Sequence, residues 1–201
     1  RQGCPLSPMI FALAMEPFAC QLRQRAPEWG IEISDINHKI SLSADDALVY
    51  LRAPINSLPG LLKFLERFGK LSGLKVNWPK SCVFPLRYIP SPLRTPTPHT
   101  QLRWEYDTFK YLGINIYHSI PDLIEGNIHR AIRSTRGSMR FWLTLPLSPL
   151  GRVSISKMLV LPRLLYYFSA LPLPLPKRLF IELNTLLGEL IWGPNRHRVS
   201  L

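Results

Sequence analysis

Cysteine is scarce in this chain of 201 residues, which contains only Cys4, Cys20 and Cys82. Their number is odd, their spacing is wide and no CxxC pair occurs, so the sequence favours neither a disulfide framework nor a zinc ribbon. We therefore expect a protein of a reducing, intracellular compartment. No signal-peptide pattern follows Arg1, and because the first residue is not Met we expect a piece of a longer chain.

Long apolar runs without charge or proline are also absent. The segment closest to one spans residues 158–175, and it is interrupted by Pro162, Arg163, Pro172 and Pro174. A membrane-spanning helix requires about 20 consecutive, predominantly apolar residues. We therefore expect no membrane partner; a membrane-associated protein built around this segment would have to bind vesicles even at high salt.

Acidic residues are missing from one long stretch, residues 126–181. The whole chain has 25 Lys and Arg against 13 Asp and Glu, a net charge of +12. Residues 1–82 contain 10 basic and 7 acidic residues, whereas residues 83–201 contain 15 and 6. The basic residues of the acid-free stretch are Arg130, Arg133, Arg136, Arg140, Arg152, Lys157, Arg163, Lys177 and Arg178. A basic block without acids indicates a polyanionic partner.

Apolar side chains are present in sufficient number for a core, since 46% of the residues are hydrophobic and 10% are aromatic. This composition excludes a disordered chain. The 20 prolines are about twice the average usage of roughly 5% and argue against an all-helical bundle. They favour a chain of many short, punctuated segments.

Two helices are predicted in the first part of the chain. The first has a cap at Ser7 and a proline in its first turn, and Pro17 is expected to kink or divide it. The second is expected to start from a cap at Ser57 and to end at Gly73, with leucines at helical spacing between them.

An acidic pair occupies a predicted hairpin turn. Residues 39–42 and 47–51 are short apolar strands, and only residues 43–46, which include Asp45 and Asp46, separate them. Asp is a favoured turn residue, so a plain exposed turn is one explanation of the pair. The other follows from the apolar residues on both faces of the second strand, because two anions beside a buried sheet need a cation, and carboxylates suit Mg²⁺. Two-metal phosphoryl transfer needs more carboxylate oxygen than one pair supplies, so a further acid must come from elsewhere.

The second half begins with a proline-rich, extended connector, residues 83–100. Residues 109–117 then predict a strand pair broken at Gly113. Three helical segments are expected after it, with starts marked by Pro121, Ser148 and Pro176. The last of them ends at Gly193 and carries one apolar face, made of Leu179, Phe180, Leu183, Leu186, Leu187, Leu190 and Ile191.

Five strings carry a family resemblance: RQGCPLSPMIFALAMEP (1–17), SLSADDALVYL (41–51), FGKLSGLKVNWPKS (68–81), FKYLGINI (109–116) and the run 142–192. In this order and spacing, they resemble the reverse transcriptase of a non-LTR retrotransposon, most closely the LINE-1 type. The resemblance covers essentially the whole chain and implies an α+β fold: a partial right-hand polymerase palm, made of a helix and antiparallel hairpins, followed by an α-helical thumb. It divides the chain into a partial palm (1–82), a connector with a primer-grip-like hairpin (83–120), and the thumb with the start of the following region (121–201).

The resemblance also implies roles for single positions. Asp45 and Asp46 correspond to the catalytic, metal-binding acids, with Asp45 the more direct ligand of Mg²⁺ or, alternatively, Mn²⁺. Lys80 corresponds to a lysine near the leaving group; Lys75 is its rival, and a solvated surface lysine is the plain alternative. Nucleotide and template binding falls on the first string, at Arg1, Gln2, Gly3, Pro5 and Ser7, where an ordinary capped helix is the plain alternative.

Contacts with the nucleic-acid backbone are implied for two further groups. The primer grip corresponds to Phe109, Lys110, Tyr111, Leu112 and Gly113, although a plain buried hairpin has the same pattern. Phosphate contacts correspond to Arg130, Arg133, Arg136, Arg140, Arg152 and Lys157. The first four of these are spaced so that they fall within an arc of about 120° on one helix. A solvated helix face is the alternative, but acids are normally interspersed on such a face.

By resemblance, the function is RNA-directed DNA polymerisation, the extension of a DNA 3′ end with dNTPs on an RNA template. The full-length element would act in the cytoplasm and nucleus, and would also contain fingers, the upstream palm and an endonuclease. Ser43 stands where the family has a large aromatic residue, and the palm segment with a further catalytic aspartate is not in this sequence. We therefore expect the chain to bind template–primer without appreciable synthesis. The alternative is a non-catalytic, nucleic-acid-binding remnant of such an element.

Overall fold

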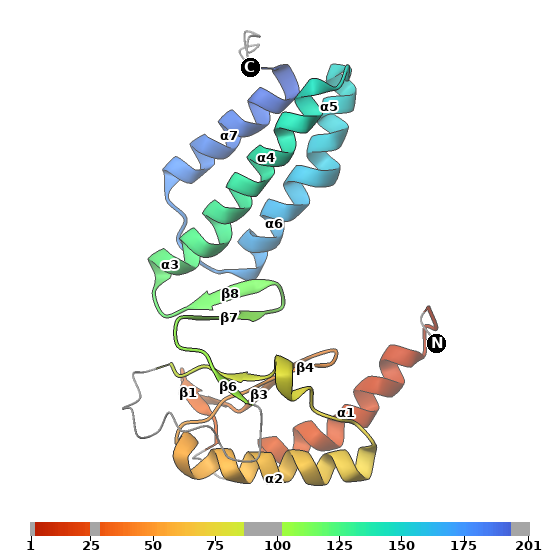
Figure 1. Cartoon of the computed structure of the whole chain (residues 1–201), viewed down its shortest axis with the longest axis vertical. Helices are drawn as coiled ribbons and strands as arrows, with labels where there is room; N and C mark the ends of the chain where they lie inside the picture. The colour runs from red at the N-terminus through yellow and green to blue at the C-terminus, as the bar shows by residue number, and fades with distance from the viewer. Residues whose placement is uncertain (1–2, 25–28, 87–101, 194–201) are drawn as a thin grey trace. The chain divides into compact units, whose positions relative to one another are not determined.

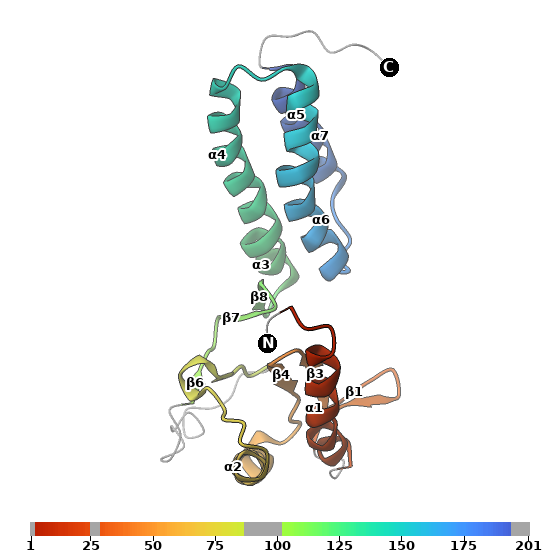
Figure 2. The same cartoon turned by 90° about the vertical axis from the view of Figure 1, so that its right-hand side faces the viewer.

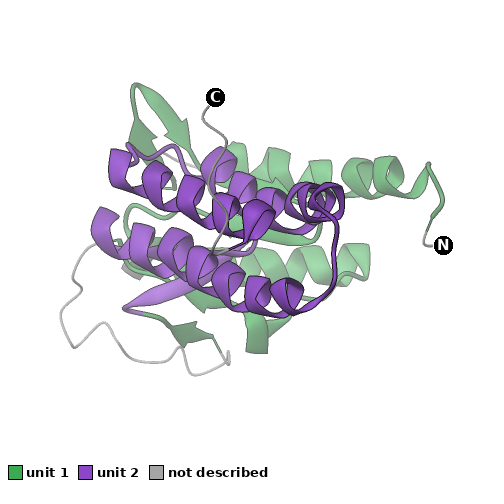
Figure 3. Cartoon of the chain, turned by 90° about the horizontal axis from the view of Figure 1, so that it is seen from above, with its two compact units in different colours: residues 1–105 green, residues 106–201 purple. Residues whose placement is uncertain are grey.

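The computed structural model describes residues 3–24, 29–86 and 102–193. The chain divides into two compact units, Arg1–Glu105 and Tyr106–Leu201 (Figure 3), and each is described by itself. Most of the predicted connector falls on residues 87–101, which lie outside the described residues. Helices and small sheets occur together in the chain, which confirms the predicted α+β class. The predicted three-part division stays a prediction.

The first unit opens with helix α1, Ser7–Arg23 (Figure 1). Ser7 was predicted to cap this helix, but it is the first helical residue, and the cap position is Leu6, which has no side-chain cap hydrogen bond. The chain already turns before the helix, because the amide N–H of Ser7 donates to the carbonyl of Cys4 (3.3 Å). The helix continues through Pro17, so this proline does not divide it.

Short strand pairs complete the sheet structure of this unit. They are β1 (Ile31–Ile33) with β2 (Ile36–His38), β3 (Ile40–Ser43) with β4 (Asp46–Val49), and β5 (Cys82–Val83) with β6 (Arg103–Trp104). The first two pairs are antiparallel and the third is parallel. The pairing of β3 with β4 confirms the predicted hairpin, with a turn shorter than expected.

The cap position of helix α2, Pro54–Ser72, is Ala53, four residues before the predicted cap Ser57. Ser57 is buried inside it, and its hydroxyl donates to the carbonyl of Ala53 at 2.7 Å, one turn back, so it does not cap the helix. The predicted end is confirmed, because Gly73 takes a left-handed φ of 75°, a conformation that suits glycine at a helix end. A 3-10 turn, η1, follows at Trp78–Lys80.

Aromatic side chains from α1 and α2 form the core of the first unit. The ring of Phe18 lies 5.4 Å from that of Phe64 and 5.0 Å from that of Phe68, measured between centroids. Trp29 and Leu22 are also buried in this cluster. Each large apolar side chain buried in this way contributes about 1.5–3 kcal/mol relative to exposure. The core thus holds α1 and α2 together, and Ile40, Leu42 and Val49 of β3 and β4 pack against it.

The second unit begins with the hairpin of β7 (Thr108–Tyr111) and β8 (Ile114–Tyr117). Its two-residue loop is Leu112-Gly113, and both residues have positive φ, 46° and 82°. Such a loop matches the twist of the strands that it joins. The predicted strand pair broken at Gly113 is confirmed.

The three predicted helical segments follow and lie side by side (Figure 2). They are α3 (Ile120–Ile124), the π-helical turn η3 (Glu125–His129) and α4 (Arg130–Thr144); α5 (Pro149–Ile155), the π-helical turn η4 (Ser156–Val160) and α6 (Leu161–Ala170); and α7 (Lys177–Trp192). No helix in the described part of the chain has the length and hydropathy needed to cross a membrane.

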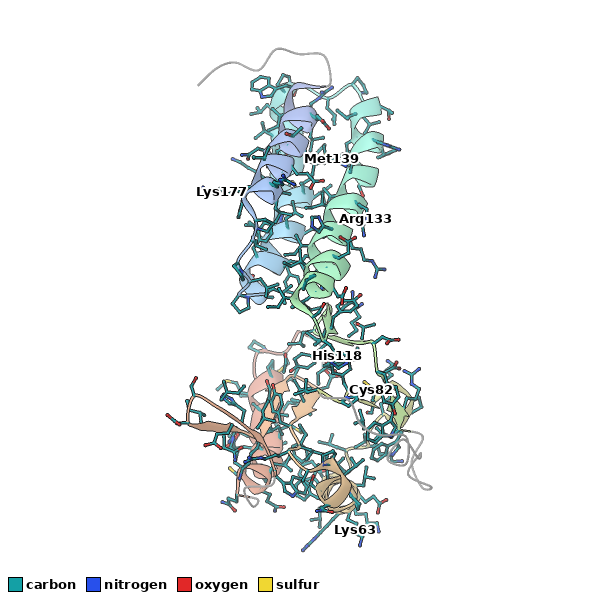
Figure 4. The ribbon with its side chains drawn as sticks, turned by 90° about the vertical axis from the view of Figure 1, so that its left-hand side faces the viewer. Lys63, Cys82, His118, Arg133, Met139 and Lys177 are labelled. Atoms are coloured by element: carbon teal, nitrogen blue, oxygen red, sulfur yellow. The ribbon has the colours of Figure 1, made fainter. Side chains whose placement is uncertain are left out.

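Leucine, isoleucine and methionine side chains from all three segments fill the core of the second unit. Met139 of α4 lies between the helices (Figure 4), together with Leu164 of α6 and Leu186 of α7. Phe180 was predicted to share the buried face of α7, but 48% of it is exposed. It follows the buried Leu179 by one position, about 100° around the helix, and therefore faces outward.

Candidate functional site

The β3–β4 hairpin carries the two aspartates at two different kinds of position. Ser43 pairs with Asp46 in the strand register, so the loop consists of Ala44 and Asp45 alone. Asp46 is thus the first residue of β4, although a four-residue turn that included it was predicted. The chain reverses in two residues because Ala44 takes a positive φ of 51°. For a residue with a side chain this conformation costs about 1–2 kcal/mol, and such strain gathers at functional sites.

Both aspartates are exposed, so the expected setting beside a buried sheet is not found. The apolar residues Ile40, Leu42 and Val49 of the hairpin pack against the core, but the turn that carries the aspartates does not. In the part of the chain that the structure describes, neither carboxylate has a salt-bridge or hydrogen-bond partner. Their oxygens are therefore accessible, and carboxylate oxygens are the ligands that Mg²⁺ prefers.

By donor chemistry the aspartate pair fits a divalent cation, but a larger acidic cluster does not surround it. Among the described residues, no group of three or more His, Cys, Asp and Glu side chains gathers where it could hold a metal ion. Lys80 ends η1, Lys75 lies in the segment before η1, and both are exposed. A role near the leaving group stays a prediction for both lysines.

The first string is described only in part, because Arg1 and Gln2 lie outside the described residues. Gly3 has a positive φ of 88°, which glycine adopts without steric cost. The side chain of Ser7 hydrogen-bonds the exposed Cys4 thiol, and this contact, aided by nearby backbone N–H groups, lowers the pKa of Cys4. A nucleotide-binding role of these residues stays a prediction.

A second thiol of α1 has the opposite environment. The Cys20 thiol donates to the Oε1 atom of Glu16 at 3.2 Å, and this carboxylate raises the pKa of Cys20. The same oxygen of Glu16 accepts a hydrogen bond from Arg23 at 2.8 Å. The pKa values of the two thiols are thus shifted in opposite directions, that of Cys4 before the start of α1 and that of Cys20 in its last turn.

The β7–β8 hairpin presents three of its predicted primer-grip residues to solvent. Lys110, Leu112 and Gly113 are exposed, whereas Phe109 and Tyr111 are half-buried. Lys110 lies opposite Asn115 in the strand register. The exposed residues include one cation and the backbone of the loop, both of which can contact phosphate.

The four arginines predicted to share one helix face all lie exposed on α4, and two of them have carboxylate partners. Arg133 donates to Glu125 at 2.6 Å and Arg136 donates to Glu182 of α7 at 3.2 Å. Figure 4 shows Arg133 on the outside of the helical unit. Arg130 and Arg140 form no salt bridge with any described residue. The stripe is therefore a mixture of paired and unpaired cations.

The other two predicted phosphate contacts do not lie on α4. Arg152 of α5 is half-buried, and its Nη1 atom lies 3.3 Å from the point where a Cβ atom on Gly193 would stand. Its side chain therefore reaches the end of α7. Lys157 of η4 is exposed.

Two residues with a defined role in the hairpin were not predicted from the sequence. Asn127 is 1% exposed and binds the backbone of β8, and the hydroxyl of Tyr166 donates to the carbonyl of Leu112. The available signal was an asparagine within a helical pattern, a residue that usually favours caps and turns. For Tyr166 no sequence pattern pointed to its partner.

The fold and these residues define an α+β protein with an acidic hairpin tip and a helix face rich in arginine. Comparison with known proteins identifies its family. Residues 1–116 match the family described as reverse transcriptase (RNA-dependent DNA polymerase), and the chain belongs to this family. It is also 30% identical over 119 residues to the "Transposon TX1 uncharacterized 149 kDa protein" of Xenopus laevis. Both matches confirm the resemblance to a non-LTR retrotransposon reverse transcriptase. The aligned part is 57% of this chain and 9% of the Xenopus protein.

Proposed function

We propose that this chain supplies the metal-binding hairpin and part of the nucleic-acid surface of an RNA-directed DNA polymerase from a LINE-type retrotransposon. The observation that carries the proposal is the exposed pair Asp45 and Asp46 on a two-residue hairpin, in a chain that belongs to the reverse transcriptase family. In this proposal the first unit contributes to the palm, and the helices of the second unit form the thumb.

Each group of residues then has a role in nucleotidyl transfer. Asp45 and Asp46 would hold Mg²⁺, which when bound activates the primer hydroxyl and stabilises the charge of the leaving group. Lys80, or its rival Lys75, would donate a proton to the pyrophosphate that leaves. The arginines of α4 would bind phosphates of the template–primer and hold its register.

The partners are an RNA template, a DNA primer and dNTPs, and the remaining segments of a larger element protein. Two-metal transfer needs more carboxylate oxygen than one pair supplies. We therefore propose that the 201-residue chain binds template–primer but does not extend it appreciably. The cytoplasm and nucleus are the proposed locations of the full-length element.

Cation binding tests the role of the aspartate pair directly. Mn²⁺ titrated into the chain and followed by calorimetry should bind, and Asp45→Asn with Asp46→Asn should abolish the heat of binding. The matched control is Asp35→Asn, since Asp35 also lies exposed in a two-residue hairpin loop, between β1 and β2. Equal loss in the control, or no loss in the double variant, would remove the metal site.

Synthesis tests the second part of the proposal. A fluorescent DNA primer annealed to RNA should bind to the chain without being extended by dNTPs. Robust incorporation that Asp45→Ala abolishes would show that the chain alone is a working polymerase. Failure to bind the annealed primer at low salt would contradict the proposed function as a whole.

Ser43 favours a second candidate, a nucleic-acid-binding remnant without catalysis. Ser43 is half-buried and pairs with Asp46. In the family that the sequence resembles, a large aromatic residue stands at this position. The test is to add the upstream segment encoded at the same locus and to compare extension by the natural chain with extension by Ser43→Tyr. Absence of extension in both polypeptides would favour the remnant, and extension in either would favour the enzyme.

A further inference from the structure

The β7–β8 hairpin is attached to the helices of the second unit by a buried amide. The Oδ1 atom of Asn127 accepts the backbone N–H of Asn115 at 2.8 Å, and its Nδ2 atom donates to the carbonyl of Asn115 at 2.7 Å. The same Nδ2 atom donates to the carbonyl of Leu123 at 2.8 Å. Asn127 thus binds both backbone groups of a strand residue, as a neighbouring strand would, and these hydrogen bonds use both N–H groups of its side-chain amide and one lone pair of the oxygen.

The π-helical turn η3 places this amide against β8. Asn127 is the central residue of η3, and the preceding residue, Gly126, lies against the ring of Tyr117. A Cβ atom on Gly126 would overlap this ring. The side-chain amide of Asn115 also donates to the carbonyl of Gly126 at 3.4 Å. Widened turns of this kind often occur at functional sites, and here the turn fits one strand closely.

A second attachment holds the loop of the same hairpin. The hydroxyl of Tyr166 in α6 donates to the carbonyl of Leu112, the loop residue with a φ of 46°. The ring of Tyr166 also lies about 3.5 Å from the point where a Cβ atom on Gly113 would stand. The loop conformation, which is unfavourable for leucine, is therefore supported by a contact from a helix 54 residues away in sequence.

We propose that Asn127 and Tyr166 are positioning residues, which hold the hairpin and the arginine stripe of α4 as one surface for an RNA–DNA duplex. The inference rests on the proposed function. Arg130 begins α4 directly after η3, so the amide of Asn127 lies within one helical turn of the first stripe arginine. Exposed Lys110 stands opposite Asn115, the strand residue that Asn127 binds. Lys110 and the first stripe arginine are thus connected through the Asn115–Asn127 contact within the second unit.

The test asks whether the phosphate contact of Lys110 depends on the hydrogen bonds that Asn127 and Tyr166 make to the hairpin. For the 201-residue chain and a fluorescent DNA primer annealed to RNA, log K is measured against log salt. Lys110→Ala should lower the slope by about 0.9, the value of one phosphate contact. Tyr166→Phe removes only the hydroxyl. In a chain that carries Tyr166→Phe or Asn127→Leu, the Lys110→Ala substitution should lower the slope by less than about half of this value. Tyr167→Phe is the matched control, because Tyr167 packs against the helical core and should leave the effect of Lys110→Ala intact.

A merely structural role would change stability and leave this coupling unchanged. A full effect of Lys110→Ala in both backgrounds, or no effect in the natural chain, would therefore overturn the inference. Hydrogen exchange gives a readout without nucleic acid: the amide of Asn115 should lose protection in Asn127→Leu, and retained protection would also overturn it. If the natural chain binds no duplex while this exchange result holds, the proposed function fails and the attachment itself stands.

Discussion

Removal of the two unpaired stripe arginines should reduce the salt dependence of duplex binding. Arg130 and Arg140 have no salt bridge among the described residues, whereas Arg133 and Arg136 are bound to Glu125 and Glu182. An unpaired guanidinium can bind a phosphate without giving up a carboxylate. Arg130→Ala with Arg140→Ala is therefore the variant that tests the stripe most directly.

The magnitude follows from counterion release. Each phosphate contact contributes about 0.9 to the slope of log K against log salt, so the double variant should lose about 1.8. When salt rises from about 50 mM to about 200 mM, the ratio of the natural chain's binding constant to the variant's should therefore fall by about 12-fold. The loss of affinity in the variant should thus be about 12-fold larger at the low salt concentration than at the high one.

Fluorescence anisotropy of a labelled RNA–DNA duplex measures these slopes. The control is Lys63→Ala with Arg67→Ala, which removes the same charge from exposed positions of α2. An equal loss of slope in this control would show that net charge alone, and not the stripe, drives binding. An unchanged slope in Arg130→Ala with Arg140→Ala would remove the stripe from the interface.

Three further predictions concern stability and reactivity. Thr135→Val should raise the free energy of unfolding by about 1 kcal/mol in urea titrations, because the buried Thr135 hydroxyl has no partner among the described residues; a lower value would contradict this. Gly126→Ala should lower it by about 1–3 kcal/mol, because the new methyl group overlaps the Tyr117 ring, and an unchanged midpoint would show that the turn relaxes freely. Cys4 should react with iodoacetamide faster than Cys20 at neutral pH, since hydrogen bonding lowers the pKa of the Cys4 thiol and raises that of Cys20; mass spectrometry of the peptides measures both rates, and the reverse order would refute the assignment.

The ends of helices could be predicted from the sequence better than some of their starts. Gly73 and Gly193 both have positive φ and end α2 and α7, as expected for a residue without a side chain. Ser148 caps α5 through its hydroxyl, as predicted. Ser57 fails as a cap because a serine inside a helix can equally bind the carbonyl four residues back, and only the neighbouring structure decides between the two.

The position of the acidic pair in a hairpin could also be predicted, but its environment could not. Alternating apolar residues and a short polar turn indicate two strands in any setting. Which part of such a hairpin is covered depends on what packs against it: here Ile40, Leu42 and Val49 contact the core, and the turn does not. Asp45 and Asp46 are therefore exposed, and their proposed function depends on a cation and not on burial.

The charge of the helical unit shows where composition misleads. Residues 126–181 contain no acid, yet the acids on both sides of this stretch, Glu125 and Glu182, bind Arg133 and Arg136. Glu182 reaches its partner across 46 residues because α7 packs beside α4, a contact that no local pattern encodes. These two pairs are exposed, so they are weak and a phosphate can displace either carboxylate. Glu125→Gln with Glu182→Gln should accordingly tighten duplex binding, and weaker binding would show that the carboxylates orient the arginines and do not compete with phosphate.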